Sequence, residues 1–142
     1  MSTHTLEGTA LALVAAGKGI LAADESHATI GRRFEALGIS NSEENRRRYR
    51  QMLFTTKGVS DFISGVILFD ETIRQAADDS RLFVEVLTSE GIIPGIKVDR
   101  GARPLAEAPG EQVTEGLDGL RERLVRHFII PVTYRACSRS GS

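Results

Sequence analysis

Three short apolar runs, each followed by an aspartate, constrain the fold of this chain more than any other feature of its sequence. They are residues 20–23, 64–69 and 95–98, and the aspartates are Asp24, Asp70 and Asp99. The first two runs are continuous, which is typical of strands that are buried on both faces, as in parallel sheets, and the third is interrupted by Lys97. Segments with helical spacing lie between them, which favours βαβ units with right-handed crossovers. The sequence therefore predicts an α/β fold.

Apolar stripes and stop signals predict the helices around these strands. We expect helices over residues 3–16, 27–37, about 40–55, 81–89 and 114–125, a short helical piece at 73–77, and a loop over 101–110. Ser40 and Glu43 have the spacing of a capping box that would start the third of these helices. The arginines of that helix, at positions 46, 47, 48 and 50, are interpreted as a solvated face.

Composition limits the classes of partner. With 41% apolar residues and a formal net charge of −1, the chain has a globular composition and no general attraction to nucleic acid or to an anionic membrane. No apolar run approaches the roughly 20 residues of a spanning helix. The first residues lack the basic region of a signal peptide, so we expect a cytoplasmic protein. The single cysteine, Cys137, excludes an internal disulfide framework, and the histidines share no ligand spacing, so no metal site is predicted.

Two residues at the strand ends are the main candidates for chemistry, because parallel barrels build their sites there. Asp24, with Ser26, either belongs to a site or caps the next helix. Lys97 is predicted to lie in the middle of the third strand and to face inward, which is costly unless the lysine is paired, and Asp24 is the candidate partner. A plain ion pair and a cation offered to a phosphate or carbonyl oxygen both remain open. Glu25 is interpreted as a surface carboxylate.

Several segments, in order, resemble class I fructose-bisphosphate aldolases. They are Gly-Lys-Gly-Ile-Leu-Ala-Ala-Asp-Glu-Ser at 17–26, Thr-Ile-Gly-Arg-Arg at 29–33, and residues 45–50, 65–69, 95–99 and 116–120. The resemblance covers about residues 17–125, and an unrelated small βα enzyme would require all these matches to be coincidental. It implies an incomplete TIM (β/α)8 barrel, with the first three βα units in residues 1–125. Residues 126–142 are expected to form a divergent, poorly ordered tail.

The resemblance also implies a reaction, which is the reversible cleavage of fructose 1,6-bisphosphate to dihydroxyacetone phosphate and glyceraldehyde 3-phosphate in glycolysis. The family forms a Schiff base and needs no cofactor. By this resemblance Asp24 shapes the field around the Schiff-base lysine, and Ser26, with Thr29, holds a sugar phosphate. Arg33 would contact the bound bisphosphate, and Lys97 would lie near a substrate phosphate.

The family's Schiff-base lysine lies on the sixth strand, and nothing in this sequence resembles that strand. Lys18 and Lys57 match no such position, so the chain alone is expected to be inactive. The alternative is a non-catalytic truncated product that retains a sugar-phosphate-binding corner. Three strands cannot close a barrel, so Val66 and Leu68 are expected to meet water. Self-association through the open sheet edges would follow, with a homo-oligomer of the family's kind as the other expected assembly.

Overall fold

The structure, a computed structural model, describes residues 5–128. Three parallel strands form its central sheet in the order β1-β2-β3, and these strands are β1 (Gly19–Ala23), β2 (Ile63–Leu68) and β3 (Ile93–Ile96). The predicted α/β fold with a parallel sheet is confirmed. The third strand begins two residues earlier than expected and ends at Ile96, so the prediction that Lys97 lies mid-strand is wrong. The Lys97 amide still donates to the Leu68 carbonyl oxygen at 2.9 Å.

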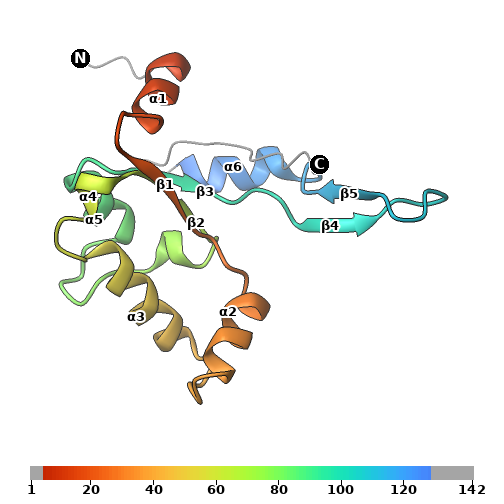
Figure 1. Ribbon diagram of the computed structural model, residues 1–142, viewed down its shortest axis with the longest axis horizontal. Coiled ribbons are helices and arrows are strands. Elements are labelled where there is room, and N and C mark those ends of the chain that lie inside the picture. Colours follow the sequence, from red (N-terminus) through yellow and green to blue (C-terminus); the bar gives the residue numbers. More distant parts are fainter. Residues whose placement is uncertain (1–4, 129–142) are drawn as a thin grey trace.

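Helices cover one face of this sheet (Figure 1). These are α3 (Glu43–Phe54) and α5 (Phe83–Ser89), together with the 3-10 turn η1 (Thr72–Arg74). The rings of Phe54 and Phe83 pack edge to face in this core, with 5.3 Å between their centroids. Val66 is 1% exposed and Leu68 is fully buried, so the expectation that they meet water is wrong. They lie two residues apart and so share one face of β2. Both belong to the buried cluster that includes Phe54 of α3 and Phe83 of α5, so this face is the one that the helices cover.

The other face of the sheet is partly open. Ala22 and Ile67 are paired across β1 and β2 on this face; Ala22 is exposed, and Ile20 is 44% exposed. Helix α1 (Leu6–Leu13) covers its beginning (Figure 1), where Leu13 packs so closely on Gly65 that a Cβ there would overlap its Cδ2 atom. The hydroxyl of Ser64 donates to the Leu13 carbonyl oxygen at 2.6 Å.

The helix α2 (His27–Glu35) follows β1, and Ser26 is its N-cap. Helix α3 begins after Ser42, whose hydroxyl accepts a hydrogen bond from the Asn45 amide at 3.2 Å. The capping box predicted at Ser40 is therefore misplaced by two residues. Ser40 instead accepts hydrogen bonds from the Asn45 side-chain amide, at 2.8 Å on its carbonyl and 3.0 Å on its hydroxyl. The short helix α4 (Val59–Phe62) leads into β2.

An antiparallel hairpin stands where a loop was predicted. Its strands are β4 (Gly101–Pro104) and β5 (Gln112–Glu115), and it projects from the rest of the chain (Figure 1). Pro104 is compatible with it because it ends an edge strand, where no partner needs its missing N–H. Helix α6 (Leu120–Phe128) begins six residues later than predicted and runs across the start of the expected tail. The rest of that tail, 129–142, lies outside the described residues, so its disorder stays a prediction.

Within residues 5–128, every helix is too short or too polar to cross a membrane.

Candidate active site

A lysine between two carboxylates lies at the carboxyl ends of β1 and β3. The Nζ of Lys97 is 3.7 Å from Oδ2 of Asp24 and 2.5 Å from Oδ2 of Asp99, and each of the three side chains is about one quarter exposed. Asp24 and Lys97 therefore open to the same side of the sheet, as predicted. The cluster is half-buried, so its charges interact more strongly than they would in bulk water and remain accessible to a ligand.

Asp99, which was not predicted as a site residue, is the closer partner of Lys97. Burial raises the pKa of the Asp99 carboxyl, but the hydrogen bonds from Lys97 and from the Gly101 amide, at 3.0 Å, lower it more. The pKa of Asp99 consequently lies below its ordinary value. Asp99 follows Lys97 by two residues, and side chains with this spacing share a face of an extended chain. That spacing is the sequence signal that could have identified it.

Ser26 and Thr29 lie together at the start of α2, Ser26 as the N-cap and Thr29 in the first turn. The Ser26 hydroxyl accepts from the Thr29 amide at 3.4 Å, and the two side-chain oxygens are 3.2 Å apart. The capping role that the sequence left open for Ser26 is therefore real. Capping does not exclude ligand binding, because the start of a helix also presents N–H groups and partial positive charge to an anion.

Glu25 is not a surface carboxylate, because its side chain is only 10% exposed. It pairs with Arg33 on α2 and lies 3.0 Å from Nη2 of Arg50 on α3. The hydroxyl of Tyr49 donates to it at 3.4 Å. Arg33, predicted to contact a bisphosphate, is thus held at Glu25, and its own side chain is 56% exposed and reaches solvent.

The arginines of α3 are not a solvated face either. Arg46 donates to both carboxylate oxygens of Glu71, at 2.8 and 2.6 Å, and Arg47 pairs with Glu44 and Asp78. Only Arg48 among the four resembles the predicted exposed arginine, with a side chain that is 72% exposed. The Glu44–Arg47 pair lies within α3 at a local spacing of three residues. The sequence did not indicate the other pairings, because Glu71 and Asp78 come from distant segments.

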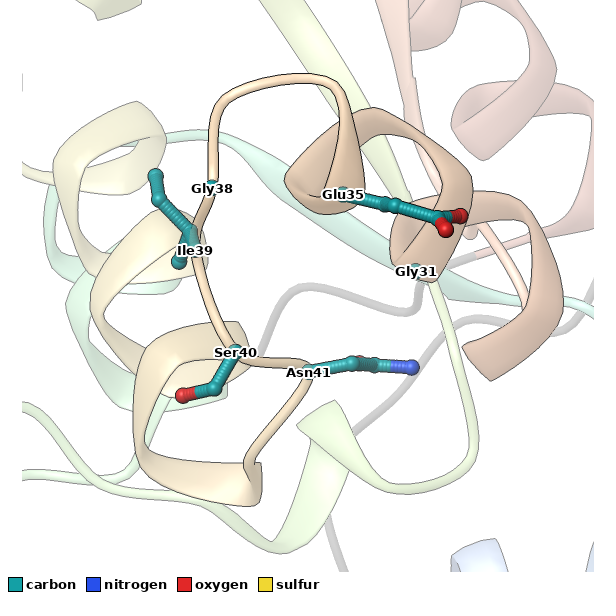
Figure 2. Close-up of a pocket in the computed structure, with 6 residues that line it drawn as sticks. All are labelled: Gly31, Glu35, Gly38, Ile39, Ser40 and Asn41. Carbon is teal, nitrogen blue, oxygen red and sulfur yellow. The ribbon is translucent and has the colours of Figure 1, made fainter.

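A separate shallow hollow lies between α2 and the loop that follows it (Figure 2). It is lined by Gly31, Glu35, Gly38, Ile39, Ser40 and Asn41. The Asn41 side chain points across it toward Gly31 and donates to the His27 carbonyl oxygen at 3.0 Å. None of the predicted site residues lines this hollow, so it is distinct from the cluster at the strand ends.

Across residues 5–128, no three His, Cys, Asp or Glu side chains are arranged to hold a metal ion. The site residues carry cationic and hydroxyl groups beside carboxylates. Lysine, arginine and helix N–H groups are suited to bind a sugar phosphate.

Comparison with known proteins agrees with this chemistry. The family model "Fructose-bisphosphate aldolase class-I" matches residues 5–130. The "Probable fructose-bisphosphate aldolase class 1" of Xanthomonas axonopodis pv. citri is 61% identical over 130 residues, which are 92% of this chain and 39% of that protein. The "Fructose-bisphosphate aldolase 2" of Caenorhabditis elegans is 52% identical over 118 residues, which are 83% of this chain and 32% of that protein.

A solved structure matches as well. It is the fructose-bisphosphate aldolase from Plasmodium falciparum in a ternary complex with TRAP and a small-molecule inhibitor, with a TM-score of 0.81 and 50% identity. The match covers 85% of this chain and 35% of that one, so the chain spans well under half the length of the aldolases that it matches. The family match and these identities establish that the chain belongs to the class I fructose-bisphosphate aldolases.

Proposed function

We propose that this chain contributes the phosphate-binding corner of a fructose-bisphosphate aldolase that cleaves fructose 1,6-bisphosphate reversibly in glycolysis. In this proposal residues 1–125 form the first three βα units of a TIM barrel, and the protein acts in the cytoplasm. The observation that carries it is the position of Lys97 at the strand ends, 3.7 Å from Asp24. A lysine there can leave a carboxylate partner and pair with a phosphate, because it is a point charge on a flexible stem.

Each predicted residue has a role in this proposal. Lys97 binds a substrate phosphate, and Ser26 with Thr29 donates hydroxyl hydrogen bonds to it at the start of α2. Arg33, whose side chain is 56% exposed, supplies a second cation. Asp24 adds a negative charge beside the place where the family's Schiff-base lysine forms its protonated imine, which stabilises positive charge as it develops.

We further propose that the polypeptide of residues 1–142 binds the bisphosphate but does not carry out the covalent step. A Schiff base needs an unprotonated amine that attacks the ketone, with an acid/base group beside it. Among the lysines of the sequence, the amine of Lys97 is paired with the carboxylates of Asp24 and Asp99, and the amine of Lys18 donates to the Ser60 carbonyl oxygen at 2.6 Å. Lys57 is an exposed residue on the turn after α3.

Calorimetric titration of the 142-residue chain with fructose 1,6-bisphosphate tests the binding proposal. We expect Lys97→Met to weaken binding by about tenfold or more, since a charge-assisted contact contributes roughly 1.5–3 kcal/mol. Lys57→Met is the matched control because it removes the same charge from an exposed turn, and it should leave the dissociation constant unchanged. Equal effects of the two substitutions would show that Lys97 does not hold the phosphate.

Borohydride trapping with dihydroxyacetone phosphate, followed by mass analysis, tests the covalent step. We expect no adduct. A stable adduct on Lys18, Lys57 or Lys97 would contradict the proposal that these residues bind without forming a Schiff base.

A further inference from the structure

We propose that Arg50, on α3, is the positioning residue for the turn after β1, which is residues 24–26. The inference rests on the proposed function, because it assigns to Arg50 the placement of Asp24 and Ser26 toward the sugar phosphate. Arg50 itself lies behind this turn and is only 2% exposed.

One nitrogen of Arg50 holds both the main chain and the side chain of Glu25. Its Nη2 donates to the Glu25 carbonyl oxygen at 3.1 Å and lies 3.0 Å from the carboxylate atom Oε2. Glu25 stands between Asp24 and Ser26, so this double contact fixes the direction in which the two flanking side chains leave the turn.

The environment of Arg50 argues that stability alone does not explain it. Burial lowers the pKa of Arg50, and the charges of Glu25, Tyr49, Glu71 and Asp24 oppose that effect. Within the described part of the chain, its Nε and Nη1 atoms have no hydrogen-bond partner. Apolar residues often replace a buried ion pair with no loss of stability. The guanidinium of Arg50 forms its hydrogen bond through one nitrogen, and it also lies over the ring of Tyr49, 5.3 Å from its centroid. Arg50 is therefore better explained by what it holds than by the free energy it adds.

Glu25 also positions the exposed residues of the site. Its other carboxylate oxygen, Oε1, pairs with Arg33, and Ser26 caps α2 through the Thr29 amide. A shift of Glu25 would move Ser26 and Arg33 together. Arg50 thereby positions residues that contact the ligand, although Arg50 itself does not contact the ligand.

A double-mutant cycle in the 142-residue chain tests this inference. Calorimetric titration with fructose 1,6-bisphosphate is carried out on the parent, Arg50→Lys, Ser26→Ala and the double variant. Lysine keeps the charge of Arg50 but cannot reach both Glu25 atoms in the same geometry. We expect Arg50→Lys to raise the dissociation constant about tenfold. Ser26→Ala should then raise the dissociation constant several times less in the Arg50→Lys variant than in the parent, because the Ser26 hydroxyl is already displaced there.

Arg48→Lys is the matched control, since Arg48 lies on the same helix and pairs with Glu44 at 3.1 Å with its side chain 72% exposed. It should leave both the dissociation constant and the Ser26→Ala penalty unchanged. A folded Arg50→Lys variant in which the Ser26→Ala penalty equals that of the parent would overturn the inference, because Arg50 would then only stabilise the fold.

Amide NMR of the ligand-free chain separates failure of this inference from failure of the proposed function. We expect the amide resonances of residues 24–29 to shift in Arg50→Lys and to stay in place in Arg48→Lys. If the parent chain does not bind the bisphosphate, the proposed function fails, while unshifted resonances would overturn the inference. Should Arg50→Lys fail to fold, Glu25→Gln provides the same measurement, because it removes the carboxylate and keeps the shape of the side chain. Unshifted Ser26 and Thr29 amides in that variant would also overturn it.

Discussion

Glu71 is the carboxylate at which three segments of the chain meet. It follows β2, accepts two hydrogen bonds from Arg46 on α3, and lies 3.1 Å from Nε2 of His27 on α2. The hydrogen bonds from Arg46 lower the pKa of Glu71, burial opposes them, and the charges of Arg46 and His27 lower it further. The pKa of Glu71 thus lies below its ordinary value of 4.5.

We expect this residue to make the fold sensitive to acid. Because its pKa is lower in the folded chain, Glu71 contributes stability above pH 4.5, and that stability is lost as the pH falls through the folded pKa. Glu71→Gln should lower the free energy of unfolding by about 1–3 kcal/mol at pH 7 and flatten its decline below pH 4.5. Denaturant melts over a pH series measure both effects.

Glu90→Gln is the control for that series, because it removes an exposed carboxylate at the end of α5. If the free energy of unfolding fell equally steeply below pH 4.5 in the parent and in Glu71→Gln, that result would contradict the role given to Glu71.

At the scale of residues, the sequence predicted some of the side-chain pairings at the site and missed others. The pairing of Asp24 with Lys97 was predictable, because parallel strands bring their carboxyl ends to one edge of the sheet. The burial of Glu25 and Arg50 was not, because each is charged and only the packing of α3 behind the turn makes them partners. Charged residues are seldom buried unless they are paired, so a solvated position was the natural first interpretation of both.

At the scale of elements, helix α1 is attached to the sheet by a close fit between Leu13 and Gly65. We expect Gly65→Ala to lower the free energy of unfolding by about 1–3 kcal/mol, because the added methyl group overlaps the Leu13 side chain. In a chain that already carries Leu13→Ala, the same substitution should cost much less. Thermal or denaturant melts of the four chains in this cycle measure the coupling.

Gly19→Ala is the matched control, because its new Cβ would meet no heavy atom within 4 Å beyond its chain neighbours. Additive effects of Gly65→Ala and Leu13→Ala would show that α1 does not rest on this position of the sheet.

The elements themselves were predicted unevenly. The strands were found to within about two residues, since continuous apolar runs mark burial strongly. The hairpin was missed because its strands are short and exposed, so hydrophobic alternation is absent from β5, in which all four residues are exposed. Leu117 misled the prediction of the last helix, because it is 83% exposed and lies outside α6.

At the scale of the whole molecule, strands β1 and β3 are the outer strands of the described sheet. Their outward backbone groups and the exposed Ile20 and Ala22 form a surface that can pair with another chain. We expect the 142-residue polypeptide to associate as its concentration rises. Sedimentation velocity over a concentration series measures this.

Ala22→Lys should shift that equilibrium toward the monomer, because it places a charge on the open face of an outer strand. Leu37→Lys is the control, since it adds the same charge at a 73% exposed residue beyond α2. A parent chain that stays monomeric at every concentration would count against association through the sheet.

The hairpin β4–β5 leaves and rejoins the chain at nearly the same place. The Arg100 amide donates to the Glu115 carbonyl oxygen at 2.9 Å, and Gly116, with φ of 141°, lies against the backbone of Asp99. Arg123 fastens the junction by donating to the carbonyl oxygens of Val98 and Gly116. The hairpin is therefore an insertion that is closed at its base, and the turn between β4 and β5 is a suitable site for grafting. A peptide tag or fluorophore inserted in that turn would lengthen the hairpin and leave its base, with the neighbouring Lys97, unchanged.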